Sequence, residues 1–218
     1  SHEPLSSGSS YSNFRNPLGL VYRMLTSGQR AAWSALFREG LGKLAVPVDL
    51  LLSVSESKKL KTATDERLPV ILIVGPPRSG TTLIYQVLGY SLDVTYPNNL
   101  GSLLPRSPIT ASRMATKRRA EFQNFYGQTA RMSGPNDAFH IWNRWLGSDR
   151  YTARTDLSDA EIDEMPRFFH AWTAVQQKPF LNKNNRNAEC AGMLAKYLPS
   201  SYFVAVRRDP VCVARSLI

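Results

Sequence analysis

The residues best suited to chemistry lie in one run, from Gly75 to Thr82, which reads GPPRSGTT. The purely apolar segment VILIV at 70–74 precedes this run, and a mostly apolar stretch follows it. A glycine-rich turn between a strand and a helix directs backbone N–H groups and the positive end of the helix dipole towards one point. The run therefore predicts a phosphate-binding loop.

This loop lacks the lysine that nucleoside triphosphatases place on the β- and γ-phosphates. Thr81 stands at the position of that lysine, and it cannot supply a cation there. Arg78 instead places a permanent positive charge on the loop itself. We expect the cofactor-binding residues here to be Arg78, Ser79, Gly80, Thr81 and Thr82, whose backbone N–H groups, hydroxyls and guanidinium can hold an anionic group.

A second candidate phosphate site follows another apolar segment, residues 202–206. Arg208 comes at the end of this segment, and Asp209 and Pro210 are good residues for the start of a helix. Ser216 falls about two turns along that helix, on the face of Asp209. The Arg208 guanidinium and the Ser216 hydroxyl can then bracket one phosphate.

Together the two runs resemble the sulfotransferases that use 3′-phosphoadenosine 5′-phosphosulfate. PRSGTT at 77–82 resembles their 5′-phosphosulfate loop, in the arginine form of the tyrosylprotein branch, and the Arg-Asp-Pro run with its serine resembles their 3′-phosphate motif. The resemblance covers residues 68–218. It implies transfer of a sulfuryl group to an acceptor hydroxyl, with adenosine 3′,5′-bisphosphate as the product and no metal ion.

The resemblance also implies a second cation at the reacting group. Leu181-Asn182-Lys183 is similar to the middle strand of the family, whose lysine reaches the sulfate, and the tyrosylprotein branch has the same Asn-Lys pair. Arg78 and Lys183 would both face the sulfuryl group. There they would stabilise the charge that builds on the bridging oxygen as the S–O bond breaks.

The general base is harder to place. Family members often carry it shortly after the strand that follows the first helix, but residues 94–99 read VTYPNN and contain neither histidine nor glutamate. His140 is the best substitute, because it follows the Gly134-Pro135 turn and adjoins two tryptophans. Asp137 is the alternative, acting alone or orienting the histidine, and a packed core histidine is the other interpretation of His140.

Composition limits the partners of the chain. The net charge of +10 and the sequence pI of about 9.9 favour anionic partners. The arginine and lysine clusters lack the interleaved aromatic residues of single-strand binders, which argues against nucleic acid. The acceptor can be a small molecule, a glycan, a lipid or a protein tyrosine, and the sequence indicates neither the choice among these nor an oligomeric state.

The expected location is the cytoplasm, with membrane association as an alternative. The two cysteines have no metal-ligand spacing and are expected to be packed thiols in a reducing compartment. No apolar run is long enough to span a membrane, and the start of the chain has no secretory signal pattern. Residues 18–52 combine apolar and basic side chains, so a peripheral contact of the N-terminal helices with a membrane surface is a further prediction.

The elements that must position these residues alternate between strand and helix. This pattern predicts an α/β fold, with a P-loop-type parallel sheet flanked by helices and an N-terminal helical extension. Because parallel strands end at the same edge, we expect the runs at 75–82, 183–187 and 207–216 to meet there. The expected strands are 68–74, 180–183 and 202–206, and the expected helices are 80–90, 109–125, 158–177, 189–198 and one from 210 onward.

Two parts are expected along the chain. Residues 1–67 comprise a disordered, serine-rich start, helices within 18–52 and a polar linker from Ser55 to Arg67. Residues 68–218 form the nucleotide-binding domain. The resemblance implies further helices and a basic loop after Ile218, so this domain is expected to be incomplete at its C-terminus. A non-catalytic nucleotide-binding protein and a nucleotide kinase are the alternatives to a sulfotransferase.

Overall fold

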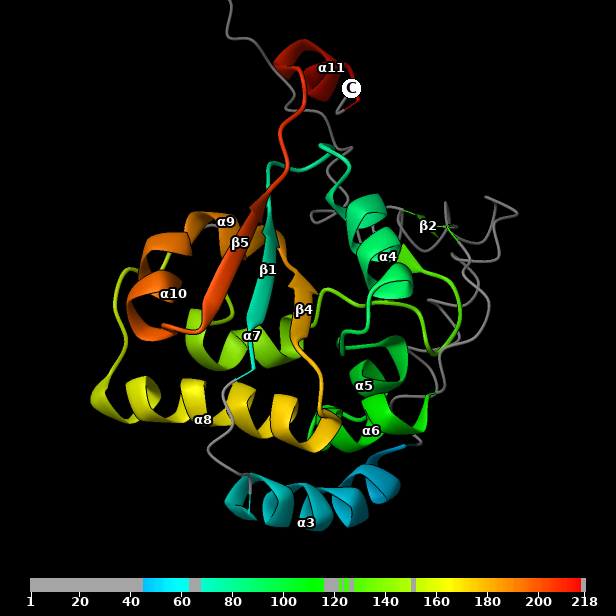
Figure 1. Cartoon of the computed structure of the whole chain (residues 1–218), viewed down its shortest axis with the longest axis vertical. Helices are drawn as coiled ribbons and strands as arrows, with labels where there is room; N and C mark the ends of the chain where they lie inside the picture. The colour runs from blue at the N-terminus through cyan, green and yellow to red at the C-terminus, as the bar shows by residue number, and fades with distance from the viewer. Residues whose placement is uncertain are drawn as a thin grey trace, which may run out of the picture.

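A computed structural model describes residues 45–62, 68–115, 122, 124–125, 128–149 and 152–216. The expectations for residues 1–44, including the serine-rich start and the helices before Ala45, lie outside these residues. The described part is an α/β fold with a parallel sheet at its centre (Figure 1). The fold class expected from the alternating pattern is therefore confirmed, including a helix that precedes the sheet.

Three parallel strands form the central sheet, in the order β4-β1-β5. They are β1 (Val70–Val74), β4 (Phe180–Lys183) and β5 (Ser201–Ala205). In the register, Ile73 lies beside Lys183 on one side of β1, and Val74 lies beside Ala205 on the other. The loop after β1 and the residues that end β4 and β5 therefore meet at one edge of the sheet, as expected.

Helices surround this sheet and connect its strands. In Figure 1, α8 lies across the end where β4 begins, and α3 lies beyond α8, far from the loop that follows β1. A short hairpin pairs β2 (Asn124–Phe125) with β3 (Gln128–Thr129). The described helices are α3 (Val46–Thr62), α4 (Thr81–Ser91), α5 (Asn99–Leu103), α6 (Pro108–Met114), α7 (Phe139–Leu146), α8 (Asp159–Gln176), α9 (Asn185–Glu189), α10 (Ala191–Tyr197) and α11 (Pro210–Arg215).

An aromatic core joins α7 and α8 to the sheet. Trp142 and Trp145 are fully buried on α7, and both pack against Phe169 of α8. Phe169 in turn contacts Phe180 of β4 edge-on, with 4.9 Å between ring centroids. Aromatic rings in such geometries stabilise a core beyond their buried area. The two tryptophans that follow His140 in the sequence are therefore core residues.

The linker expected from Ser55 to Arg67 is wrong as far as Thr62, because α3 continues through that segment. The polar composition of residues 55–62 misled the prediction, but Glu56 in this segment and Asp49 earlier on the helix both face inward. Asp49 accepts hydrogen bonds from the Ser107 hydroxyl at 2.7 Å and from a neighbouring backbone N–H. Glu56 accepts three hydrogen bonds at the start of α6. Carboxylates at a helix N-terminus satisfy its free N–H groups and interact favourably with its dipole.

Two other expected helices differ in the structure. The helix expected at 109–125 ends at Met114, and Asn124 and Phe125 belong to a strand. The helix expected at 189–198 is present as α10, from Ala191 to Tyr197, and the short helix α9 precedes it where no helix was expected. Cys190 is buried, but Cys212 is exposed, so only the first is a packed thiol.

The outward side of α3 is apolar and basic, because its acidic residues point inward. Leu51 is 75% exposed, and Val54 and Leu50 are exposed on the same side of the helix. No helix in the described ranges is long and apolar enough to cross a membrane. Peripheral contact of the N-terminal helices with a membrane surface stays a prediction.

We expect Glu56→Ala to lower the free energy of unfolding by about 3 kcal/mol, since it leaves three donors without a charged acceptor in a buried place. Ser57→Ala is the matched control: Ser57 is exposed on the same helix, and its loss should change stability by less than about 0.5 kcal/mol. Urea unfolding of both variants measures the difference. Equal effects would mean that Glu56 does not hold α3 to α6.

Candidate active site at the carboxyl edge of the sheet

The loop after β1 has a backbone that depends on its glycines. A side chain at Gly75 would place its Cβ 2.8 Å from the Val206 carbonyl oxygen, so only glycine allows this close approach to the neighbouring strand. Gly80 has a φ of 95°, in the left-handed region that glycine adopts without strain. Arg78 has a φ of 66° in the same loop, which is costly for a residue with a Cβ. Such strain occurs where the surrounding structure fixes the backbone, often at ligand sites.

One buried hydroxyl in this loop has no internal partner. Ser79 is 6% exposed, and its Oγ forms no hydrogen bond with any described residue. Thr81 is also buried, at the first position of α4. Because buried hydroxyls are normally hydrogen-bonded, the Ser79 hydroxyl is suited to a polar group that binds in the loop.

The two motifs singled out in the sequence touch each other in the structure. Arg208 donates a hydrogen bond from Nη1 to the Arg78 carbonyl oxygen at 2.9 Å. Arg78 in turn donates from Nε to the Ser216 carbonyl oxygen at 3.2 Å. The Asp209 side chain accepts a hydrogen bond from the Cys212 N–H and so begins α11, as expected. Two exposed guanidinium groups therefore lie at the edge of the sheet, beside the loop.

Ser216 lies at the C-terminal end of α11 with its hydroxyl turned to its own helix. Its Oγ donates to the Val213 carbonyl oxygen at 2.9 Å. To donate to a phosphate, this hydroxyl must rotate away from Val213. The structure thus places Ser216 at the end of α11, with its hydroxyl proton directed to the helix backbone.

Lys183, the last residue of β4, is paired with a carboxylate. Its Nζ lies 2.8 Å from Asp137 Oδ2, and the side chains are only 5% and 16% exposed respectively. Burial raises the pKa of Asp137, while the charge of Lys183 and its hydrogen bond oppose this rise. The result is a buried ion pair at the end of the strand next to β1.

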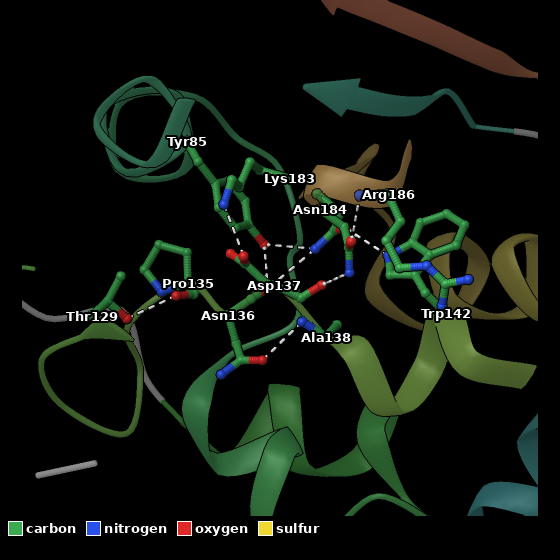
Figure 2. Close-up of polar contacts among 11 residues, drawn as sticks. Tyr85, Thr129, Pro135, Asn136, Asp137, Ala138, Trp142, Lys183, Asn184 and Arg186 are labelled. Carbon is green, nitrogen blue, oxygen red and sulfur yellow. Dashed lines mark hydrogen bonds and ion pairs between the residues drawn. The ribbon is translucent and has the colours of Figure 1, made fainter. Parts of the chain in front are cut away.

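The residues on either side of Lys183 hold the backbone that carries Asp137 (Figure 2). Asn182 donates from Nδ2 to the Asn136 carbonyl oxygen at 3.1 Å, and Asn184 donates to the Asp137 carbonyl oxygen at 2.9 Å. Asn182 is itself oriented by Trp142, whose Nε1 donates to the amide oxygen at 2.7 Å. We call the tripeptide Asn182-Lys183-Asn184 the β4 clamp, because all three side chains bind the segment at Asp137.

The other side of this segment is fixed by a second set of contacts. The Asn136 side chain accepts a hydrogen bond from the Ala138 N–H and donates to the side chain of Asn99. Gly134 has no room for a side chain, since a Cβ there would lie 2.2 Å from the Ala130 carbonyl oxygen. Ala138 has a φ of 55°, which turns the chain sharply into α7. Asp137 therefore stands on a backbone that is held from both sides.

His140 lies apart from this group. Burial lowers its pKa to about 4, the charge of Arg144 adds to the effect, and Asp49 opposes it. Asp49 belongs to α3, at the far end of the molecule from the loop (Figure 1). The Nε2 atom of His140 is buried without a hydrogen-bond partner among the described residues. This nitrogen therefore forms no hydrogen bond with Lys183 or with the other residues of the β4 clamp.

The protein is an α/β protein in which a glycine-rich loop, two guanidinium groups and a buried lysine lie at the carboxyl edge of the sheet, where such folds place their ligands. A model of the sulfotransferase family matches residues 69–218. Because this match covers more than half of the chain, the protein belongs to the sulfotransferase family, and the expected family is confirmed. A sulfotransferase-like function follows for the matched domain. The comparisons with curated proteins and with solved structures found no match.

Several residues of this site carry no signal in the sequence by themselves. For Asn184 and Trp142, neither the residue type nor the spacing predicts the hydrogen bonds that the structure shows. The repetition of asparagine on both sides of Lys183 is the one sequence feature that could have indicated the β4 clamp. Within the described ranges, no group of three histidine, cysteine, aspartate or glutamate residues is arranged to hold a metal ion.

The buried state of His140 predicts a pH dependence of stability. The unfolded chain binds a proton with an ordinary histidine pKa near 6.5, and the folded chain only near 4, so stability falls as the pH is lowered through this interval. Between pH 7 and pH 5, the free energy of unfolding of the unaltered protein should fall by about 2 kcal/mol more than that of the His140→Gln variant. Urea unfolding at both pH values measures this. Parallel pH profiles for the two proteins would show that His140 is not buried in its neutral form.

Proposed function

We propose that the protein transfers a sulfuryl group from 3′-phosphoadenosine 5′-phosphosulfate to an acceptor hydroxyl. The observation that carries this proposal is the contact between the two motifs, in which Arg208 donates to the backbone of Arg78. A donor with phosphate groups at both its 5′ and 3′ positions needs two adjacent anion sites. The adjacent ends of β1 and β5 supply them.

The residues present suit this donor. The loop offers the buried Ser79 hydroxyl, the start of α4 at Thr81 and the positive charge of Arg78 for the 5′ side. Arg208 and, after rotation, the Ser216 hydroxyl suit the 3′-phosphate. When bound, the donor supplies an activated sulfuryl group whose leaving group is a phosphate oxygen.

In this proposal, Arg78 and Lys183 stabilise the negative charge that develops on the bridging oxygen during transfer. Arg78 is exposed on the loop, while Lys183 is buried at the end of the neighbouring strand. A buried cation acts in a low dielectric, where it stabilises developing charge more strongly than in water. Protein cations then do what Mg²⁺ does for nucleoside triphosphates. The acceptor class stays open among a small molecule, a glycan, a lipid and a protein tyrosine.

Two alternative functions would require different residues in the site. A nucleotide kinase needs a cation at the position of Thr81, and this hydroxyl residue argues against that function. A non-catalytic nucleotide-binding protein needs the two motifs but not the buried pair of Lys183 and Asp137. Maintaining a buried ion pair is costly, which favours a reactive site over a binding site.

We expect adenosine 3′,5′-bisphosphate to raise the melting temperature of the protein, and Mg²⁺-ATP to have little effect. A ligand at one hundred times its dissociation constant stabilises a protein by about 2.7 kcal/mol, which a thermal shift assay detects readily. Adenosine 5′-monophosphate is the matched control, because it lacks the 3′-phosphate. Equal or greater stabilisation by Mg²⁺-ATP would overturn the proposed donor.

Substitutions of Arg78 and Arg208 should differ in their effects on kcat and on nucleotide binding. Arg78→Ala should lower kcat much more than it weakens binding of the nucleotide, since its charge matters most as the S–O bond breaks. Arg208→Ala should weaken nucleotide binding by about tenfold or more, with a smaller effect on kcat. Arg215→Ala, an exposed arginine on α11, is the control. Calorimetry measures the binding of adenosine 3′,5′-bisphosphate, and steady-state kinetics measures kcat. If both variants lost binding and kcat in the same proportion, the separate roles of the two arginines would be contradicted.

A further inference from the structure

We propose that Asp137, held in place by the β4 clamp, is the general base of the transfer reaction. This inference rests on the proposed function and assigns the proton acceptor that the sequence left open between His140 and Asp137. Its starting point is the geometry of the carboxylate and of the backbone that carries it.

The two oxygens of the Asp137 carboxylate have different surroundings. Oδ2 is bound to Lys183 Nζ at 2.8 Å. Oδ1 receives no hydrogen bond from a described residue, and the side chain keeps 16% of its surface exposed. One oxygen is therefore fixed by the lysine, while the other is free to accept a proton from a hydroxyl that reaches the end of β4.

The backbone of Asp137 is held as a catalytic group requires. Asn182 and Asn184 bind two consecutive carbonyl oxygens, those of Asn136 and of Asp137 itself. Tyr85 is fully buried on α4, and its hydroxyl lies 3.3 Å from both the Asn136 carbonyl oxygen and Asn182 Nδ2. Contacts from β4 and α4 thus fix the same peptide, and the carboxylate has little freedom to leave Lys183.

Lys183 connects this carboxylate to the proposed reacting group. The acceptor oxygen forms a bond to sulfur, and the bond between sulfur and the bridging phosphate oxygen breaks, with its electron pair passing to the phosphate. The acceptor proton passes to Asp137 Oδ1. Neutralising Asp137 removes the negative partner of Lys183 at the moment when negative charge grows on the bridging oxygen. The lysine can then direct its charge to the leaving group without a change of position.

The environment of Asp137 supports this role, and that of His140 does not. Burial raises the pKa of Asp137, which makes its carboxylate a better proton acceptor than an exposed aspartate. His140 is influenced by Asp49 and Arg144, and not by a group of the β4 clamp. A base must lie within hydrogen-bond reach of the proton it takes. Of these two residues, only Asp137 contacts Lys183.

The test compares Asp137→Asn, His140→Gln and Asp163→Asn in the full chain. Donor turnover is measured with a panel of sugar, phenol and lipid hydroxyl acceptors. Asp137→Asn should lower kcat by about 100-fold or more, which is the usual contribution of a general base. Adenosine 3′,5′-bisphosphate should raise the melting temperature of this variant by as much as it raises that of the unaltered protein. Asp163 is an exposed carboxylate on α8, so Asp163→Asn controls for the loss of a charge.

Two further measurements separate catalysis from a structural role. Formate should restore part of the activity of Asp137→Ala, because a small carboxylate can enter the space left by the side chain. Asn184→Ala should lower kcat by between about 10-fold and 100-fold with little change in the KM for the donor, as expected for a misplaced base.

The outcomes distinguish this inference from the function on which it rests. If the unaltered protein transfers sulfuryl groups and Asp137→Asn retains its rate, the base is another residue and the proposal is overturned. A larger loss of kcat in His140→Gln than in Asp137→Asn would also overturn it, in favour of the histidine. If the unaltered protein shows neither a thermal shift with the bisphosphate nor transfer to any acceptor, the proposed function itself fails.

Discussion

The buried ion pair between Lys183 and Asp137 is the interaction on which the rest of the site depends. Removing two charges from water costs several kcal/mol, and the cost is recovered only with good geometry and further hydrogen bonds. The surrounding asparagines supply these by fixing the backbone on both sides of the pair. The indole of Trp142, which orients Asn182, is itself part of the aromatic core. The packing of α7 and α8 therefore determines the position of a charged group at the edge of the sheet.

The parallel sheet determines where this pair lies relative to the loop that follows β1. β1 lies between β4 and β5, so the loop after β1 has the buried lysine on one side and Arg208 on the other. Neither neighbour is close to the loop in the sequence. Short strands in a fixed register bring them together, and this explains why a small sheet suffices for the site.

The sequence predicted the parts of this arrangement that depend on local chemistry. Local sequence patterns determine the structure of three such parts: the glycines of the loop, the Asp209 cap of α11 and the apolar strands. The prediction failed at the second half of α3, because Glu56 looks like a residue of an exposed linker until α6 is known to lie beside it. The ion pair of Lys183 with Asp137 could not be predicted either, because it depends on how the turn at 134–138, distant in the sequence, packs against β4. Segments held by tertiary contacts rather than by their own composition were the ones that sequence patterns could not place.

Under the proposed function, the hydrogen bond from Arg208 to the Arg78 carbonyl oxygen couples the sites for the two anionic groups of the donor. A group that orders the loop also orders the end of β5, and a group that orders Arg208 also orders the loop. Thermodynamic linkage makes this relation reciprocal, so each half of the ligand raises the affinity of the site for the other by the same factor. A molecule that carries both anionic groups gains from this cooperativity, whereas one that carries either group alone does not. With the proposed donor, the site would therefore select for ligands that carry both anionic groups, in addition to the contacts that each group makes alone.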